Sequence, residues 1–243
     1  VPVMSIMNMP PLPYLKRIKG LDTAALQACY TDPSVWSGFD PARFTLCSPD
    51  PQAFRPPDEK ANVLQVRLPT NFKAARFASN ADTAILERLE ADIAAARYRI
   101  GDETLELPVK LKVHGSIFVP MAKWAMLLAG NYRCVQADGM RPIKDAVHSD
   151  IAASRAVYDW VAGLCVALGA SPADMVPFEK YAAAAQSLLS PSSAARALAA
   201  GAQNIERVDK LVQAIAAQKG MRLAAIDETV ALVDGWLATN RRK

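Results

Sequence analysis

A lysine and an asparagine stand eight positions apart in the otherwise apolar stretch Val119–Asn131. On an α-helix, Lys123 and Asn131 would be separated by about 80° of rotation and roughly 12 Å along the axis, so one elongated ligand could reach both. A lysine among Met, Ala, Trp and Leu either extends its ammonium group past the apolar surface to water or is held in a site. The spacing alone leaves both readings open.

The cysteines and histidines do not predict a metal centre. The four cysteines are Cys29, Cys47, Cys134 and Cys165, and the two histidines are His114 and His148. No two cysteines form a C-x-x-C pair, so we expect no bound metal. Isolated cysteines in a chain without a secretory segment are typical of reduced thiols, which predicts a cytoplasmic location.

Composition excludes several classes of partner. The 243 residues are 51% hydrophobic and 21% charged, with a formal net charge of +4. Basic and acidic residues are interleaved, so we expect no nucleic-acid partner. No apolar run approaches the 18 or so residues that predict a membrane span. Gly-x-Gly-x-x-Gly, Gly-x-x-x-x-Gly-Lys and nucleophile-elbow motifs do not occur in these residues, so the chain contains no self-sufficient catalytic motif.

The first half of the chain mixes strands and helices. Strands are expected at 1–7, 44–47, 62–68 and 107–113, and helices at 23–30 and 82–98. The Pro-rich residues 8–13 are expected to form neither helix nor central strand. Residues 33–61 are expected to form a long ordered loop around the strand at 44–47. In 82–98, Ile85, Leu89 and Ile93 recur at helical spacing, which predicts an amphipathic helix.

The second half is expected to be helical throughout. Helices are predicted at 118–130, 143–168, 172–189, 192–201, 203–218 and 225–239. Ser171-Pro172 and Ser192 have the residue types of helix starts, and Gly169, Gly201 and Gly220 fall at helix ends. We place a domain boundary near residue 116, between a mixed α/β part, 1–115, and an all-helical part, 116–243.

The Lys123 stretch and the last third of the chain resemble the ketopantoate reductase family. The family's catalytic helix carries a lysine followed by asparagines four and eight residues later. Lys123 and Asn131 match the lysine and the second asparagine, whereas Leu127 replaces the first. The family also has a strand that ends in Asn-Gly beside the nicotinamide, and Val3–Asn8 resembles this strand with Met9 in place of the glycine.

Two further motifs extend the resemblance toward the C-terminus. Pro191-Ser-Ser-Ala is similar to the family's Ser-Ser pair at a helix start, which places Ser192 at the substrate-binding serine. Counting back from Gly220 without gaps places Asn204 at the substrate-binding glutamate. An insertion of one or two residues would place Glu206 there instead. The ungapped count preserves the helical phase and is the preferred one.

The resemblance implies a fold, a cofactor and a reaction. Residues 1–115 would be the C-terminal part of a Rossmann-like dinucleotide-binding domain, and 116–243 an all-helical substrate and dimerisation domain. The family's Gly-rich loop would lie before Val1. The implied reaction reduces a 2-oxo acid or ketone with NADPH, with NADH also open, and family members often form homodimers through the helical domain.

The resemblance also assigns roles to residues. Lys123 would be the general acid, with its pKa lowered by burial in an apolar cleft. Asn131 and Asn204 would bind substrate, Ser192 would hold its carboxylate, and Asn8 would lie beside the cofactor.

Each of these roles has a structural alternative. Asn131 can end a helix, Ser192 can cap one, Asn204 can start one and Asn8 can form a turn. Leu127 and Asn204 depart from the family pattern, so an altered substrate or lost activity is expected. The competing hypothesis is a non-catalytic helical interaction module.

Overall fold

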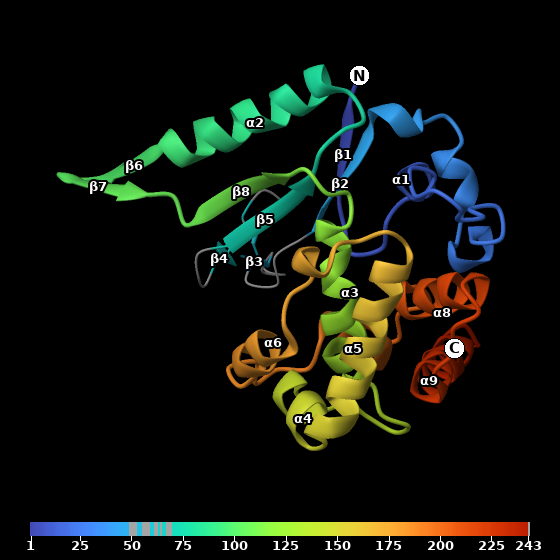
Figure 1. Ribbon diagram of the computed structural model, residues 1–243. Coiled ribbons are helices and arrows are strands. Elements are labelled where there is room, and N and C mark those ends of the chain that lie inside the picture. The colour runs from blue at the N-terminus through green and yellow to red at the C-terminus, as the bar shows by residue number, and fades with distance from the viewer. Residues whose placement is uncertain (49–52, 55–58, 61–62, 64, 67–69, 243) are drawn as a thin grey trace.

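The computed structural model describes residues 1–48, 53–54, 59–60, 63, 65–66 and 70–242. A mixed four-stranded sheet lies at one end and a larger group of helices at the other (Figure 1). The strand order is β1 (Val3–Ile6), β2 (Phe44–Ser48), β5 (Thr70–Ala75), β8 (Val109–His114). The pairs β1–β2 and β5–β8 are parallel, and β2 runs antiparallel to β5. This small mixed sheet followed by helices confirms the fold class expected from the sequence.

The central strand β2 is buried along its whole length, as its sequence Phe-Thr-Leu-Cys-Ser requires. Its one threonine is satisfied inside the sheet, because Thr45 Oγ1 donates to the carbonyl of Ala75 at 2.6 Å. Two short antiparallel pairs complete the strands: β3 (Ala53–Phe54) with β4 (Gln65–Val66), and β6 (Arg97–Ile100) with β7 (Glu103–Glu106). Most of the strand expected at 62–68 lies outside the described residues.

Helix α2 (Asn80–Ala95) confirms the expected helix, but a different face is buried. Thr83 and Leu86 face inward, whereas Ile85 and Leu89 are 56% and 42% exposed. Polar anchors explain the difference. Thr83 Oγ1 accepts from the backbone N–H of Phe77 at 3.1 Å, and Glu90 Oε2 accepts from the N–H of Val113, on β8, at 2.7 Å. These hydrogen bonds set the rotation of α2 about its axis, so Ile85 and Leu89 of the apolar stripe are exposed instead of buried.

The Pro-rich turn and the segment that follows it differ from expectation. Helix α1 (Leu12–Leu15) begins inside residues 8–13, which were expected to exclude a helix. It forms because Pro13 occupies the first turn, where the missing N–H has no helical partner to lose. The helix expected at 23–30 shortens to a 3₁₀ turn over Gln27–Cys29.

The helical part follows the sequence in the order of its helices but not in all their bounds. Its α-helices are α3 (Lys123–Met126), α4 (Ile143–His148), α5 (Ile151–Ala167), α6 (Phe178–Ala185), α7 (Ser193–Ala199), α8 (Val208–Gln218) and α9 (Ala224–Asn240). The helix expected over 143–168 divides into α4 and α5, because the Asp150 side chain accepts from the N–H of Ala153 and starts a new helix there. The helix expected at 172–189 becomes a 3₁₀ turn over Pro172–Asp174 and a shorter α-helix that begins at Phe178. Helix α8 begins at Val208, five residues later than expected.

One continuous apolar cluster connects the sheet side of the molecule with the helices. It extends from Leu12 and Leu26 through Trp124 to Leu237. A smaller cluster, which includes Phe77 and Leu86, lies between the sheet and α2. None of the helices in the described ranges combines the length and the hydropathy that a bilayer span requires.

Candidate functional site

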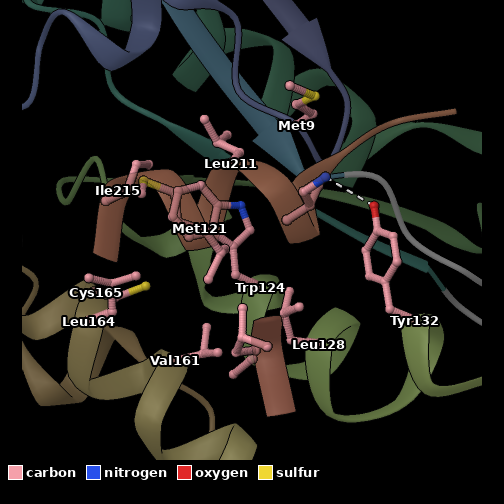
Figure 2. Close-up of a cluster of buried hydrophobic side chains, with 14 of the residues drawn as sticks. Met9, Met121, Trp124, Leu128, Tyr132, Val161, Leu164, Cys165, Leu211 and Ile215 are labelled. Atoms are coloured by element: carbon pink, nitrogen blue, oxygen red, sulfur yellow. Dashed lines mark hydrogen bonds between the residues drawn. The ribbon is translucent and has the colours of Figure 1, made fainter. Parts of the chain in front are cut away.

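The Lys123 stretch is one helical run that changes its winding three times. A 3₁₀ turn (Val119–Ala122) leads into α3, a π turn (Leu127–Asn131) follows, and another 3₁₀ turn (Tyr132–Cys134) ends it. Figure 2 shows Trp124 and Leu128 within the same buried cluster as Leu211 and Ile215 of α8. Because π turns inside helices often occur at functional sites, this run is the first place to look for one.

Side chains from neighbouring helices support the irregular winding. The hydroxyl of Tyr181, on α6, donates to the carbonyl of Met126 at 3.0 Å. The hydroxyl of Ser192, just before α7, donates to the carbonyl of Asn131 at 2.6 Å. Both carbonyls belong to the part of the run where regular helical bonding is altered, and such groups need other partners when buried.

Lys123 begins α3 and is half-buried. Its charge acts on the thiol of Cys47, in β2, and lowers the pKa of that thiol, although burial has the larger effect and raises this pKa to about 11. The 3₁₀ turn that precedes Lys123 contacts β2, and Trp124 bonds to the carbonyl of Asn8, so the lysine lies near the carboxyl ends of β1 and β2. Parallel strands β1 and β2 end together there, since the N–H of Met7 donates to the carbonyl of Cys47 at 3.3 Å.

Asn8 follows β1 and connects three segments of the chain. Its backbone N–H donates to Glu206 Oε1 at 3.3 Å, and its side-chain Nδ2 donates to Glu206 Oε2 at 3.2 Å. Its carbonyl accepts from the indole Nε1 of Trp124 at 3.2 Å. Trp124, which follows Lys123 in the chain, is thus bonded to the turn after β1. Asn8 is half-buried and Glu206 is exposed, so a ligand can reach this contact from solvent.

Tyr132 holds the segment that carries Glu206. Its hydroxyl donates to the carbonyl of Glu206 and accepts from the N–H of Val208 at 3.0 Å, the bond drawn in Figure 2. Burial raises the pKa of Tyr132, so its hydroxyl stays protonated. Residues between α7 and α8 therefore have a defined path without being helical. For this reason the helical phase assumed in the ungapped count does not apply to them.

Asn204 lies elsewhere. Its Oδ1 accepts from Thr31 Oγ1 at 3.4 Å and from Arg241 Nη2 at 3.2 Å. It lines a cavity of about 160 Å³ together with Cys29 and Lys210. The structure brings Glu206, and not Asn204, to Asn8.

Ser192 acts as a helix cap with both hydrogen-bonding functions occupied. It is 2% exposed, its Oγ accepts from the N–H of Ala195 at 3.2 Å, and its proton goes to the carbonyl of Asn131. A serine hydroxyl has one proton to donate, so Ser192 would have to release Asn131 before it could bind a carboxylate. Asn131 is half-buried, and Leu127 lies half-buried between Lys123 and Asn131 along the helical run.

Sequence reasoning missed Trp124 and Tyr132. Each directly follows a residue singled out for chemistry, Lys123 or Asn131. A Trp or Tyr in an apolar helix carries a polar group that needs a partner when buried, and this was the available signal. The partners themselves, Asn8 and Glu206, are 116 and 74 residues away. No residue pattern connects positions so far apart.

The described residues contain no group of three or more His, Cys, Asp or Glu side chains that could hold a metal ion. The Gly-rich loop that would hold the pyrophosphate of a dinucleotide does not occur in the 243 residues.

Solved structures of similar fold include two reductases. The first is a probable 2-dehydropantoate 2-reductase from Bacillus subtilis, with a TM-score of 0.58, 9% identity and coverage of 97% of this chain and 69% of that one. The second is a ketopantoate reductase of the PanE/ApbA family from Ralstonia eutropha JMP134, with a TM-score of 0.59, 16% identity and coverage of 98% and 67%. No family model matches the sequence, and the comparison with curated proteins found no match.

Proposed function

We propose that this protein, which has the fold of the ketopantoate reductases, is a reductase that uses NADPH to reduce a 2-oxo acid or ketone. The observation that supports this most is the position of Lys123. It begins the helix that meets the carboxyl ends of parallel strands β1 and β2, and its neighbour Trp124 bonds to Asn8 at that edge. In α/β sheets, ligands bind outside the carboxyl ends of strands.

When bound, NADPH would supply a hydride to the carbonyl carbon of the substrate. The carbonyl oxygen then gains negative charge, and Lys123 gives it a proton, so that the product is the alcohol. The low-dielectric surroundings of Lys123, which include buried Met121 and Trp124, strengthen this charge interaction. Asn131 lies further along the same helical run and binds the distal polar group of the substrate.

Glu206 replaces Asn204 as the acidic or polar substrate ligand in this proposal. Its carboxylate already accepts two hydrogen bonds from Asn8, so a substrate hydroxyl or amine can take the place of Asn8. Ser192 contributes by holding the Asn131 backbone. Leu127 presents an apolar side chain where the family has an asparagine, so the substrate has one polar group fewer than ketopantoate at that point.

Lys123→Ala tests the proposal. We expect turnover of a panel of 2-oxo acids to fall by about 10²–10⁴-fold, the usual contribution of a general acid. Affinity for NADPH, measured by fluorescence titration, is expected to stay within about twofold, because Lys123 donates to substrate rather than to the phosphates. If the folded full-length protein that carries this chain binds no NADPH, the reductase proposal is wrong.

Paired substitutions separate Glu206 from Asn204. We expect Glu206→Ala to raise the KM for the best substrate, because the variant loses a hydrogen bond to a charged group, worth about 1.5–3 kcal/mol or roughly 10–100-fold. Asn204→Ala is the matched control and should leave kcat/KM unchanged, since Asn204 bonds to Thr31 and Arg241 and not to Asn8 among the described residues. If Asn204→Ala instead lowers kcat/KM and Glu206→Ala does not, the ungapped count, which places Asn204 at the substrate-binding glutamate, would be supported.

A further inference from the structure

A second cavity lies apart from the Lys123 site, between α5 and the two helices α8 and α9. Its volume is about 480 Å³, within the range of small-molecule sites. The indole of Trp160, on α5, forms one wall, and Ala214 and Ala217, on α8, form another. Met221 and Leu223, from the connection between α8 and α9, complete the apolar lining. Lys123, Asn8 and Glu206 do not line this cavity.

Small residues and a reversal of the chain leave this space open. Ala214 and Ala217 leave room where larger side chains would fill the gap to Trp160, and protein interiors otherwise have few voids larger than a water molecule. Gly220, at φ +67°, turns the chain sharply after α8. After this turn, Met221 and Arg222 both line the cavity.

The polar side of the cavity is a closed network. Asp227 Oδ1 accepts from Gln213 Nε2 at 2.7 Å, and Asp227 Oδ2 accepts from Arg222 Nε at 2.7 Å. These bonds lower the pKa of Asp227, so the carboxylate is ionised at neutral pH. Arg222 and Asp227 are the charged side chains of the lining, and their charges cancel.

Because the charges of Arg222 and Asp227 cancel, the cavity favours an uncharged ligand over an ionic one. An ionic ligand would have to compete with an ion pair that is already formed, and it would be attracted by one partner and repelled by the other. An uncharged ligand avoids this conflict. Asp227 has lone pairs left to accept another hydrogen bond, and Arg222 has further N–H groups to donate one.

We propose that the cavity between Trp160 and the Arg222–Asp227 pair binds an uncharged small molecule that has a planar ring and one hydroxyl or amide group. The ring lies against the Trp160 indole and the two alanines, where aromatic contact and apolar burial stabilise it. The hydroxyl or amide donates to Asp227. This site is independent of the proposed reductase function.

Three probes of one shape and different charge test the proposal. Binding of para-fluorophenol, para-fluorobenzoate and para-fluorobenzylamine is measured by fluorine NMR titration of the whole protein. We expect the phenol to bind saturably and at least about tenfold more tightly than either ion, a difference of about 1.4 kcal/mol. Lack of saturable phenol binding, or equal binding of an ion, would overturn the proposal.

Two variants show where the probe binds. Ala217→Phe fills the cavity from an exposed position on α8 and should weaken phenol binding at least about tenfold. Ala184→Phe, on an exposed position of α6 outside the cavity, is the matched control and should bind normally. If Ala217→Phe does not fold, Asp227→Asn provides a second test. The phenol should still bind to this variant, but the preference for the uncharged probe should disappear, because the charge of Arg222 is no longer neutralised. Unchanged binding in both cavity variants would place the probe elsewhere and sink the proposal.

Discussion

At the scale of single residues, one side of the His114 imidazole is buried without a hydrogen bond to the described residues. His114 ends β8, and the buried atom is its Nε2. Burial is the main cause that lowers the pKa of His114 below its ordinary value of 6.5, and the nearby charges of Lys73 and Lys112 lower it further. Glu90 and Asp174 act in the opposite direction and offset only part of this.

This lowered pKa predicts how stability depends on pH. The unfolded chain takes up a proton on His114 near pH 6.5, whereas the folded protein takes it up only at lower pH. Between these values the unfolded state binds more protons, so the free energy of unfolding falls as the pH is lowered. Urea unfolding at a series of pH values from 8 to about 5 measures the slope. His114→Gln should reduce it, and an unchanged slope would contradict the assignment.

At the scale of elements, the π turn Leu127–Asn131 depends on the close approach of α6. A Cβ atom at Gly130 would lie 1.9 Å from the hydroxyl oxygen of Tyr181 and 3.2 Å from a methyl group of Val147. The tyrosine cannot simply move away, because its hydroxyl donates to Met126 and its ring is stacked on Tyr158. Only glycine fits at this position.

Gly130→Ala should therefore lower the free energy of unfolding by about 1–3 kcal/mol, the usual cost of overpacking. Gly163→Ala is the matched control. It lies in α5 with no atom within 4 Å of the added methyl group, and alanine is favoured in helices, so stability should rise by about 0.5–1 kcal/mol. Chemical denaturation measures both changes. In a Tyr181→Phe background the Gly130→Ala cost should shrink, and an undiminished cost would show that the clash is not the cause.

At the scale of the whole molecule, the sheet side and the helical part share one core. Leu12, Leu15 and Leu26 belong to the same buried cluster as Val161 and Leu237. Hydrogen bonds also cross between the two parts, from Asn8 to Glu206 and between Asp22 and Gln218. The boundary near residue 116 stays a prediction.

The shared core predicts that the described parts unfold together. Far-UV circular dichroism, which reports the helices, and tryptophan fluorescence should give coincident urea transitions. Trp36 lies on the sheet side and Trp124 and Trp236 among the helices, so the fluorescence samples both parts. Two transitions separated in urea concentration would instead support independent domains on either side of residue 116.

Much of the architecture followed from local patterns. The order of the helices in the second half, the caps at Ser171 and Ser192, and the helix ends at Gly169, Gly201 and Gly220 depend on neighbouring residues, which a sequence displays directly. Strand β5 and the β6–β7 pair were not predicted. The same local rules gave a wrong prediction where a hydrogen bond to a residue distant in the chain overrides the apolar periodicity of a helix. Glu90 accepts from the N–H of Val113 on β8, 23 residues away, and this bond helps to set a rotation of α2 that leaves Ile85 and Leu89 exposed.

The sequence by itself determined that Lys123 and Asn131 share one helical run and that helices follow a mixed α/β part. Only the tertiary structure decided which residues join them. Glu206 and not Asn204 meets Asn8, because Tyr132 holds a non-helical segment whose path no periodicity describes. The proton of Ser192 is bonded to the Asn131 carbonyl instead of a ligand. Each of these results depends on a hydrogen bond between residues distant in the chain, and such bonds exist only once the chain has folded.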